Sequence, residues 1–591
     1  GMACGACHIA FDPLNPPADP AHPTWANLKG LVGNQYIRPS EIMASGMATD
    51  SPEWQIFTHA RPGVVDTSAV PNDQVHNPGT MNALVNVRRR PTFVGEVVNR
   101  WRRAGSCKPG ESEDVCWCEA DKPGKCWLKS QLSEPVHHIL KGGEDSIGIE
   151  GALQRVFFNI GVCAETCWAN HLTDLRQLDP QQRNFGQTPF DIAQCRRDCP
   201  NFRAIEDRLP ELVSFVLSKE GRATDLAVAR DPDPARPLAV KRKNLVDNLE
   251  KEFGRGAVAR GKTVFAANCA RCHSSQAEPF DKRDFLETDG ADPSLRADWL
   301  GNDQATPASE VGTCACRALH SNHLQGHVWS EFASQTYQTR AGDANLPDTS
   351  GGGRGYYRNV SLVSLWAHAP FMHNNAIGPE LCGKPTNKRD DFYRAPFVDG
   401  TGHLLANQPA CVAYDPSVAG RFAIYKQSMD SLLNPAARLP KMSVLDEPIR
   451  LDVGPRTWDG NKEKRIVGMT IEFPPGTPAS FFGNFQHKQF VIDLVLAKTD
   501  GAALRARLQS RLGRRPEGAK RVDAVAKELE AIADDILKHP SQFVTLARQR
   551  MPLLEELYLS CASTIENAGH RFGEDLAPAD KKALTAFLAT L

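Results

Sequence analysis

The chain has 591 residues, enough for about two to four domains with separate hydrophobic cores. Its 69 basic and 70 acidic side chains leave a formal net charge of -1, so neither nucleic acid nor an anionic membrane is an expected partner. No uninterrupted apolar run reaches about 18 residues, and we therefore expect no transmembrane segment.

The first motif in the chain is Cys4-Gly5-Ala6-Cys7-His8, which fits the pattern C-x-x-C-H. In this pattern two thiols form thioethers with the vinyl groups of a haem, and the adjacent histidine binds the iron. We therefore predict that Cys4 and Cys7 hold one haem c and that His8 is an axial ligand. A disulfide beside a bystander histidine is the alternative interpretation of a single copy.

The total number of cysteines in the chain is also informative. Seventeen cysteines, mostly in pairs, indicate an oxidising compartment, so a periplasmic or secreted protein is expected although the chain shows no signal peptide. A Gly/Pro-rich insertion near residues 104–130 has too little apolar sequence for a core, and we expect disulfides among its four cysteines. A four-cysteine zinc site is the alternative there. The four are Cys107, Cys116, Cys118 and Cys126.

Two further cysteine pairs are spaced i, i+4, namely Cys163 with Cys167 and Cys195 with Cys199. If both segments are helical, disulfides between them would cross-link two adjacent helices.

Proline and charge divide the chain near residues 231–237. We predict a first domain at 1–222, a linker at 223–243 and a second domain at 244–591 with a long insertion near 383–555. Amphipathic periods predict helices at 207–218, 246–268, 521–537 and 578–591, whereas the best strand signal, at 465–473, predicts a small hairpin.

A second C-x-x-C-H motif follows, Cys269-Ala270-Arg271-Cys272-His273. A short helix leads into it, with Phe265 four residues before Cys269 and able to pack on a haem. Cys269 and Cys272 are thus predicted to hold a second haem c, with His273 as axial ligand. Zinc is disfavoured, because two motifs this far apart in the chain do not combine into one finger.

Three histidines downstream, His320, His323 and His327, share one helical face at i, i+3 and i+7. They are candidates for a metal site or for haem-edge hydrogen bonds. A polar helix face is the alternative.

Two C-x-x-C-H motifs in one long chain resemble the di-haem cytochrome c peroxidase superfamily, which includes the di-haem rubber oxygenases. Residues 358–362 (Arg-Asn-Val-Ser-Leu) and 369–375 (Ala-Pro-Phe-Met-His-Asn-Asn) are similar to the family's loop beyond the second haem. Residues 567–576 and the following helix are similar to its closing ligand segment. The resemblance implies a mainly α fold: two cytochrome c-like haem domains with long loop-rich insertions and a small β-hairpin element.

The departures from the family favour its rubber oxygenase branch. Bacterial peroxidases carry W-D-G-R and N-P-x-E-M, whereas residues 87–93 here read Val-Arg-Arg-Arg-Pro-Thr-Phe and no N-P-x-E-M follows. The first haem of the oxygenase branch has an apolar distal pocket, for which Phe157 and Phe158 are candidates. An ordinary core helix is the alternative. The segment 77–82 is similar to the family's calcium segment, which implies Ca²⁺ with Asn77 and Pro370 as candidate ligands.

The sixth iron ligands decide the expected chemistry. The resemblance implies His570 opposite His273, with Met429 and Met442 as other candidates, and a bis-histidine haem relays electrons. For the haem at His8 none of the nearby histidines stands in a convincing position, and we expect an open iron that binds peroxide or dioxygen. The histidines considered were His22, His59 and His76.

The predicted activity is therefore that of a periplasmic or secreted di-haem oxidoreductase, with peroxidase and dioxygenase both open. It would act at the N-terminal haem on peroxide or dioxygen, with a hydrophobic organic substrate or a redox partner protein as further candidates. One alternative is an electron-transfer cytochrome with two six-coordinate irons. Another is a partner-binding module of a larger redox assembly.

Overall fold

The computed structural model describes a set of segments in which helices predominate. These are residues 9–19, 22–30, 92–137, 147–159, 190–218, 224–302, 305–311, 330–338, 356–370, 372–373, 377–379, 381–382, 412–413, 415–438, 449–453, 456–459, 462–465, 469–473, 486–512, 516–539, 550–558 and 571–591. Within them no helix combines the length and the apolar character needed to cross a bilayer.

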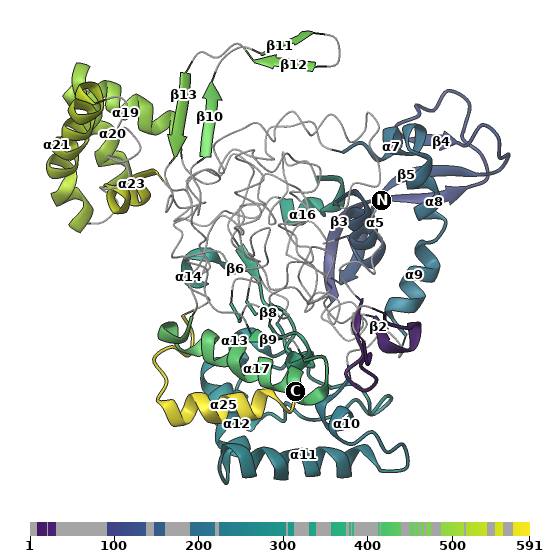
Figure 1. Cartoon of the computed structure of the whole chain (residues 1–591). Helices are drawn as coiled ribbons and strands as arrows, with labels where there is room; N and C mark the ends of the chain where they lie inside the picture. The colour runs from purple at the N-terminus through teal and green to yellow at the C-terminus, as the bar shows by residue number, and fades with distance from the viewer. Residues whose placement is uncertain are drawn as a thin grey trace.

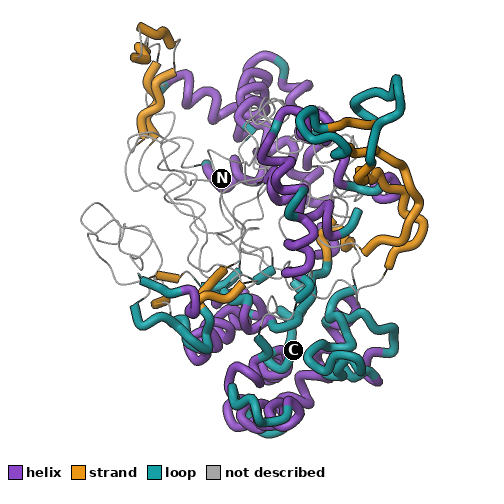
Figure 2. Tube along the Cα trace, turned by 90° about the vertical axis from the view of Figure 1, so that its right-hand side faces the viewer, coloured by secondary structure: helices purple, strands orange, loops and turns teal. Residues whose placement is uncertain are grey.

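A helical core surrounds the C-terminus, at the lower end of both views (Figures 1 and 2). It contains α10 (Leu226–Arg230), α11 (Leu238–Phe253), α12 (Ala257–Asn268), α17 (Val418–Leu433) and α25 (Pro578–Leu588). The predicted helix at 246–268 is two helices, because Gly254 and Gly256 take positive φ values of 110° and 76° between α11 and α12. The predicted helix at 578–591 corresponds to α25.

Helix α12 crosses α25 at a position where no side chain fits. A Cβ added to Gly261 would lie 2.1 Å from the carbonyl oxygen of Ala583 and 2.6 Å from Cβ of Phe587. The close approach brings Phe265 and Phe587 together with ring centroids 5.4 Å apart, and Phe285 meets Phe265 edge-on at 4.9 Å. These three buried rings form the centre of the core.

Two elements of this core come from segments predicted to be peripheral. Helix α10 lies within the predicted linker, and its residues Leu226, Ala227 and Ala229 are buried in the same core. Helix α17 lies within the predicted insertion at 383–555, yet the hydroxyl of its buried Tyr425 donates to the carbonyl of Thr585 at 2.8 Å. The described part of the second unit therefore draws its core from residues 226 to 591.

A three-stranded antiparallel sheet lies toward the other end of the molecule (Figure 1). Its order is β3 (Thr92–Ala104), β5 (Cys126–His137) and β4 (Cys116–Cys118). Helices α5 (Ile149–Asn159), α7 (Ile192–Asp198), α8 (Pro200–Glu206) and α9 (Leu209–Val216) accompany it. The helix predicted at 207–218 corresponds to α9. The long strands β3 and β5 were not predicted from the sequence.

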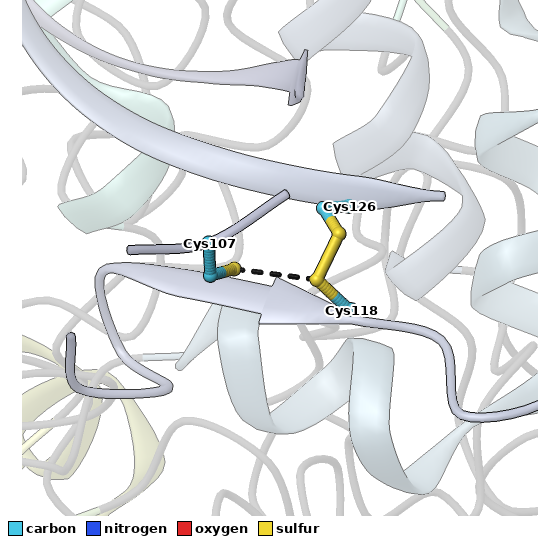
Figure 3. Close-up of side chains that lie close together, drawn as sticks. All are labelled: Cys107, Cys118 and Cys126. Carbon is cyan, nitrogen blue, oxygen red and sulfur yellow. Dashed lines mark hydrogen bonds between the residues drawn. A yellow bond between two sulfur atoms is a disulfide. The ribbon is translucent and has the colours of Figure 1, made fainter. Parts of the chain in front are cut away.

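The disulfides predicted for the Cys-rich segment are confirmed. Cys107 bonds to Cys116 and Cys118 bonds to Cys126, and both bridges lie at the β4–β5 end of the sheet. Figure 3 shows the Cys118–Cys126 bridge with Cys107 beside it. Cys199, at the start of α8, is also disulfide-bonded.

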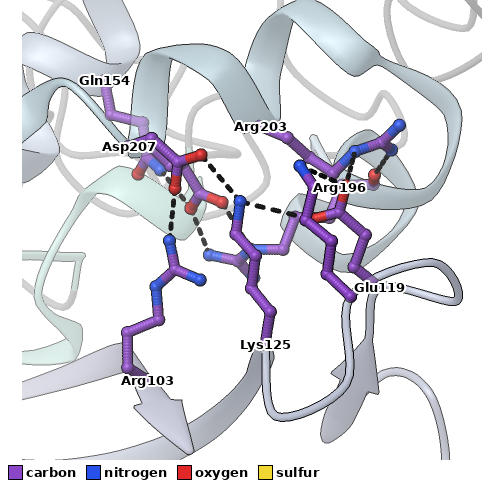
Figure 4. A network of polar contacts seen from close by, with 9 residues as sticks. Arg103, Glu119, Lys125, Gln154, Arg196, Arg203 and Asp207 are labelled. Atoms are coloured by element: carbon purple, nitrogen blue, oxygen red, sulfur yellow. Dashed lines mark hydrogen bonds and ion pairs between the residues drawn. The ribbon is translucent and has the colours of Figure 1, made fainter.

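A buried arginine joins the helices to the sheet. Arg196 on α7 is 1 % exposed and donates from Nε to Glu206 at 2.9 Å, and its guanidinium carbon lies 4.4 Å from the ring centroid of Trp101 on β3. Gln154 donates to the same carboxylate at 2.9 Å. Around this pair lies a more exposed network in which Lys125 and Arg103 both bond to Asp207 (Figure 4).

A separate helical cluster contains α19 (His487–Thr499), α20 (Gly501–Leu512), α21 (Pro516–Lys538) and α23 (Met551–Tyr558). It has its own apolar core, with Leu508, Leu529 and Leu554 fully buried. The predicted helix at 521–537 lies within α21. The predicted hairpin at 465–473 is divided, because β12 pairs with β11 whereas β13 pairs with β10, both antiparallel.

The remaining elements are short. The strands are β1 (Ile9–Phe11), β2 (Leu28–Gly30), β6 (Ala305–Pro307), β7 (Tyr356–Arg358), β8 (Leu381–Cys382), β9 (Val412–Ala413), β10 (Ile449–Val453), β11 (Arg456–Asp459), β12 (Lys462–Arg465) and β13 (Met469–Phe473). The helical turns are η1 (Trp25–Asn27), α13 (Ala270–His273), η5 (Phe280–Lys282), α14 (Ala308–Val311), η6 (Ser330–Phe332), α16 (Gln335–Gln338), η7 (Leu365–Ala367) and η8 (Pro435–Ala437).

The crossing at Gly261 gives a direct test of this packing. We expect Gly261→Ala to lower the free energy of unfolding by about 1–3 kcal/mol, because the new methyl group meets backbone rather than a movable side chain. Urea unfolding followed by circular dichroism measures the change. The matched control is Ala259→Val on the exposed face of α12, which should cost about 0.5 kcal/mol through helix propensity alone. Equal losses in the two variants would contradict the tight crossing.

Candidate functional site

The second C-x-x-C-H motif forms a single helical turn at the end of α12. The backbone N–H groups of Cys272 and His273 both donate to the carbonyl of Cys269, at 3.1 and 2.9 Å. Cys269 itself ends α12 by donating to the carbonyl of Phe265 at 2.8 Å. The turn therefore holds both thiols and the imidazole on one short, rigid element fixed to the aromatic core.

Both cysteines of this motif are free thiols rather than partners in a disulfide. Burial, assisted by the neighbouring Cys272, raises the pKa of Cys269 to about 12. Burial also raises the pKa of Cys272, against the opposing effect of Arg271. At neutral pH both side chains are therefore protonated thiols.

Among the described residues, the motif does not contribute to any group of three or more converging metal ligands. Across the described part of the chain, groups of cysteine, histidine and carboxylate with converging ligand atoms occur only at residues 107–126. Zinc also requires thiolates, which burial disfavours at Cys269. Donors that do not converge on one point suit a large group that receives each of them at a different atom.

His273 is oriented by a main-chain hydrogen bond. Its Nδ1 lies 3.0 Å from the carbonyl oxygen of Val360. Because a carbonyl only accepts, Nδ1 carries the proton, and the lone pair of the neutral ring is on Nε2. A hydrogen bond of this kind fixes the tautomer and the ring plane of a metal-binding histidine.

Polar side chains hold the segment that contains Val360 against the motif. Asn359 donates to Asn302 at 2.8 Å, and Asn302 in turn donates from its side chain to the carbonyl of Arg271 at 2.8 Å. Thr306 donates to Asn359 at 3.0 Å. Residues 302, 306 and 359 thus connect the motif to the segment 358–362.

A buried carboxylate organises the chain just after the motif. Asp298 is fully buried and accepts from the hydroxyls of Ser274 and Ser275 and from the N–H groups of Ser275 and Leu300, at 2.5–3.1 Å. The sequence analysis did not identify Asp298 or Asn302. Their signal is weak, since each is an isolated polar residue far from the motif in sequence.

The C-terminal segment reaches the same site. The guanidinium carbon of Arg271 lies 6.0 Å from the ring centroid of Phe572. Arg438 donates to Glu574 at 2.6 Å. Gly573, which lies between Phe572 and Glu574 in the chain, takes a φ of +89°. Residues 571–576 are therefore anchored on one side by the motif and on the other by Arg438, which follows η8.

Several predicted site residues lie outside the described residues, so their predicted roles stay predictions. They are Cys4, Cys7, His8, Asn77, His320, His323, His327, Met442 and His570.

The other predicted residues have described surroundings. Phe157 packs against a small core that contains Leu153 and Leu209, and Phe158 belongs to the same helix, α5. Pro370 is buried, with its carbonyl oxygen 1.8 Å from where a Cβ on Gly378 would lie. Met429 is 1 % exposed within the core that contains Phe265.

Comparisons with protein-family models, with curated proteins and with solved structures find no match for this chain. The chemistry open to the site therefore follows from its donors. Two protonated thiols can each add to a carbon–carbon double bond, and one imidazole nitrogen can bind a metal.

A second buried histidine, His368, gives this region a pH response. It follows η7, is 4 % exposed, and burial lowers its pKa to about 4, with the positive charge of Arg421 acting in the same direction. Arg421 is held nearby, donating to the carbonyl of Ala367 at 3.2 Å.

We expect acid to destabilise the fold through His368. In the unfolded chain this histidine takes up a proton below a pKa of 6.5, whereas the folded protein resists until about 4. The free energy of unfolding should therefore fall by up to about 1.4 kcal/mol per pH unit between these values. Urea midpoints at several pH values measure the slope for the wild type and for His368→Gln. The slope of the unfolding free energy against pH should be smaller in the variant, by the amount that corresponds to about one proton. Identical slopes in the two proteins would contradict the assignment.

Proposed function

We propose that the chain is a di-haem c-type cytochrome oxidoreductase that activates peroxide or dioxygen at its N-terminal haem. The observation that carries the proposal is the geometry at residues 269–273. Two partly buried, protonated thiols lie on the same turn as an imidazole whose Nδ1 is bonded to a main-chain carbonyl.

These residues suit covalent attachment of haem. Each thiol can add its S–H bond across one vinyl group, which forms a thioether and needs no oxidant. Cys269 and Cys272 would then fix the ring, and His273 would present Nε2 to the iron. A haem held in this way supplies a redox-active iron. The buried rings of Phe265 and its neighbours keep water from the attachment side.

We propose His570 as the second axial ligand of this haem. Phe572, two residues further along the chain, has its ring centroid 6.0 Å from the guanidinium carbon of Arg271 in the motif, which supports this proposal. Two histidine ligands would leave no open coordination position and would favour electron relay. Among the alternative ligands, the buried Met429 lies within the described part of the chain.

The N-terminal haem, at Cys4, Cys7 and His8, is proposed as the site where peroxide or dioxygen binds. Phe157 and Phe158 on α5 are candidates for an apolar lining. A hydrophobic organic substrate or a redox partner protein would supply the electrons. Two disulfides support a periplasmic or secreted location. A calcium ion near Asn77 and Pro370 is a further part of the proposal.

The number of attached haems tests the proposal most directly. We expect the chain, expressed in a bacterial host with c-type cytochrome maturation, to carry two haems, and Cys269→Ser/Cys272→Ser to carry one. Intact mass spectrometry and the pyridine haemochrome assay give the count. The matched control, Cys107→Ser/Cys116→Ser, should keep two. A wild type with fewer than two haems would exclude a di-haem protein.

Ligand binding separates the enzyme from a pure electron carrier. We expect the reduced protein to bind one carbon monoxide per chain, because the iron at His8 is open whereas the iron at His273 is capped. His570→Ala should raise this number to two. Difference spectra during titration measure both. No binding of carbon monoxide in the wild type would favour an electron-transfer cytochrome. If one iron does bind carbon monoxide, turnover assays with peroxide and with dioxygen would show which oxidant the protein uses.

A further inference from the structure

The four cysteines at the β4–β5 end of the sheet lie close enough to act as one site. Besides the two disulfides, Sγ of Cys107 lies 3.4 Å from Sγ of Cys118, which belongs to the other bridge (Figure 3). The ligand atoms of Cys107, Cys118 and Cys126 all lie within 4.8 Å of one another. The sulfurs of both bridges therefore form one cluster.

Strand pairing produces this convergence. Cys118 and Cys126 are direct partners in the antiparallel register of β4 and β5. Cys116 precedes Cys118 by two residues in β4, so both point to the same face of the sheet. Cys107 follows β3 and reaches the cluster from the loop. The cluster is thus held by three neighbouring segments of one small sheet, and Cys116 and Cys126 are 4 % and 2 % exposed.

We propose that this cluster has a second chemical state, in which both disulfides are reduced and the four thiolates bind one zinc ion. A tetrahedral zinc site has Zn–S distances of about 2.3 Å, which places its sulfurs roughly 3.8 Å apart. The sulfurs of the two bridges already approach to 3.4 Å. Opening each S–S bond to this spacing requires side-chain rotation but no new strand pairing.

The carboxylate of Glu111 is the competing ligand, since its oxygen lies within 4.8 Å of Cys107 and Cys116. This carboxylate already accepts from the backbone N–H of Lys108 at 2.8 Å. Thiolate sulfur is also the softer donor and suits zinc at a closed structural site. Four sulfur ligands are therefore the expected set.

The interconversion balances with a phosphine as the reductant. Each disulfide reacts with one phosphine and one water to give two thiols and one phosphine oxide. Zinc then displaces four protons from the four thiols. The reverse change, oxidation of the four thiolates to two disulfides, releases the zinc and four electrons to an oxidant such as peroxide.

The test uses the full, haem-loaded chain, in which the cysteines of the two C-x-x-C-H motifs would be covalently occupied. The protein is reduced with phosphine without oxygen, equilibrated with zinc and freed of excess. Metal analysis then gives zinc per chain. We expect one more zinc in the reduced wild type than in the oxidised wild type and in reduced Cys118→Ser/Cys126→Ser. X-ray absorption at the zinc edge should show sulfur at about 2.3 Å.

A second measurement needs no variant and stays decisive if the double variant misfolds. Zinc should protect Cys107, Cys116, Cys118 and Cys126 from alkylation in the reduced wild type, as read by peptide mass spectrometry. Equal zinc in wild type and variant, or alkylation of all four cysteines in the presence of zinc, would overturn the proposal. Neither outcome depends on how many haems the chain carries or on what they bind.

Discussion

The crossing of α12 and α25 at Gly261 is the contact on which the candidate haem site depends. The absence of a side chain there lets the backbone of one helix touch the other, so the aromatic rings on both sides close over a dry core. Helix α12 ends at Cys269, and its direction therefore sets where the thiols and His273 lie. A wider crossing would move the whole turn away from the carbonyl of Val360, which fixes the imidazole.

Local patterns predicted the local features well. The helices α9, α21 and α25 follow from amphipathic periods, and the disulfides follow from cysteine density in a segment without a core. The strands β3 and β5 were missed because their pairing links residues separated by 22 (Ala104 and Cys126) to 45 (Thr92 and His137) positions, and because charged residues interrupt their apolar faces. Glu96, for example, is buried within β3 and hydrogen-bonded to Ser334, a contact that no strand pattern indicates.

The residues of the candidate site also fall into those that a local sequence pattern predicts and those that it does not. The C-x-x-C-H pattern predicts Cys269, Cys272 and His273 because attachment chemistry demands those residues at that spacing. The groups that position them carry no such signal: Val360 contributes only a main-chain carbonyl, and Asp298 and Asn302 act through long-range loop contacts. Val360 lies within the segment 358–362 singled out in the sequence, but no sequence pattern indicates that its carbonyl makes the contact.

Cysteine has two chemical states in this protein, and strand register and burial decide between them. In the sheet, direct pairing of Cys118 with Cys126 brings the sulfurs together, and bonds form. At the end of α12, two partly buried thiols on one turn stay uncrosslinked and protonated, available to a group that bonds to each of them separately. The two clusters lie in different units of the fold (Figure 1), so redox chemistry at one need not disturb the other. If haem attaches as proposed, haem attachment and disulfide formation must select different cysteines, and the strand register at 118 and 126 would supply part of that selection.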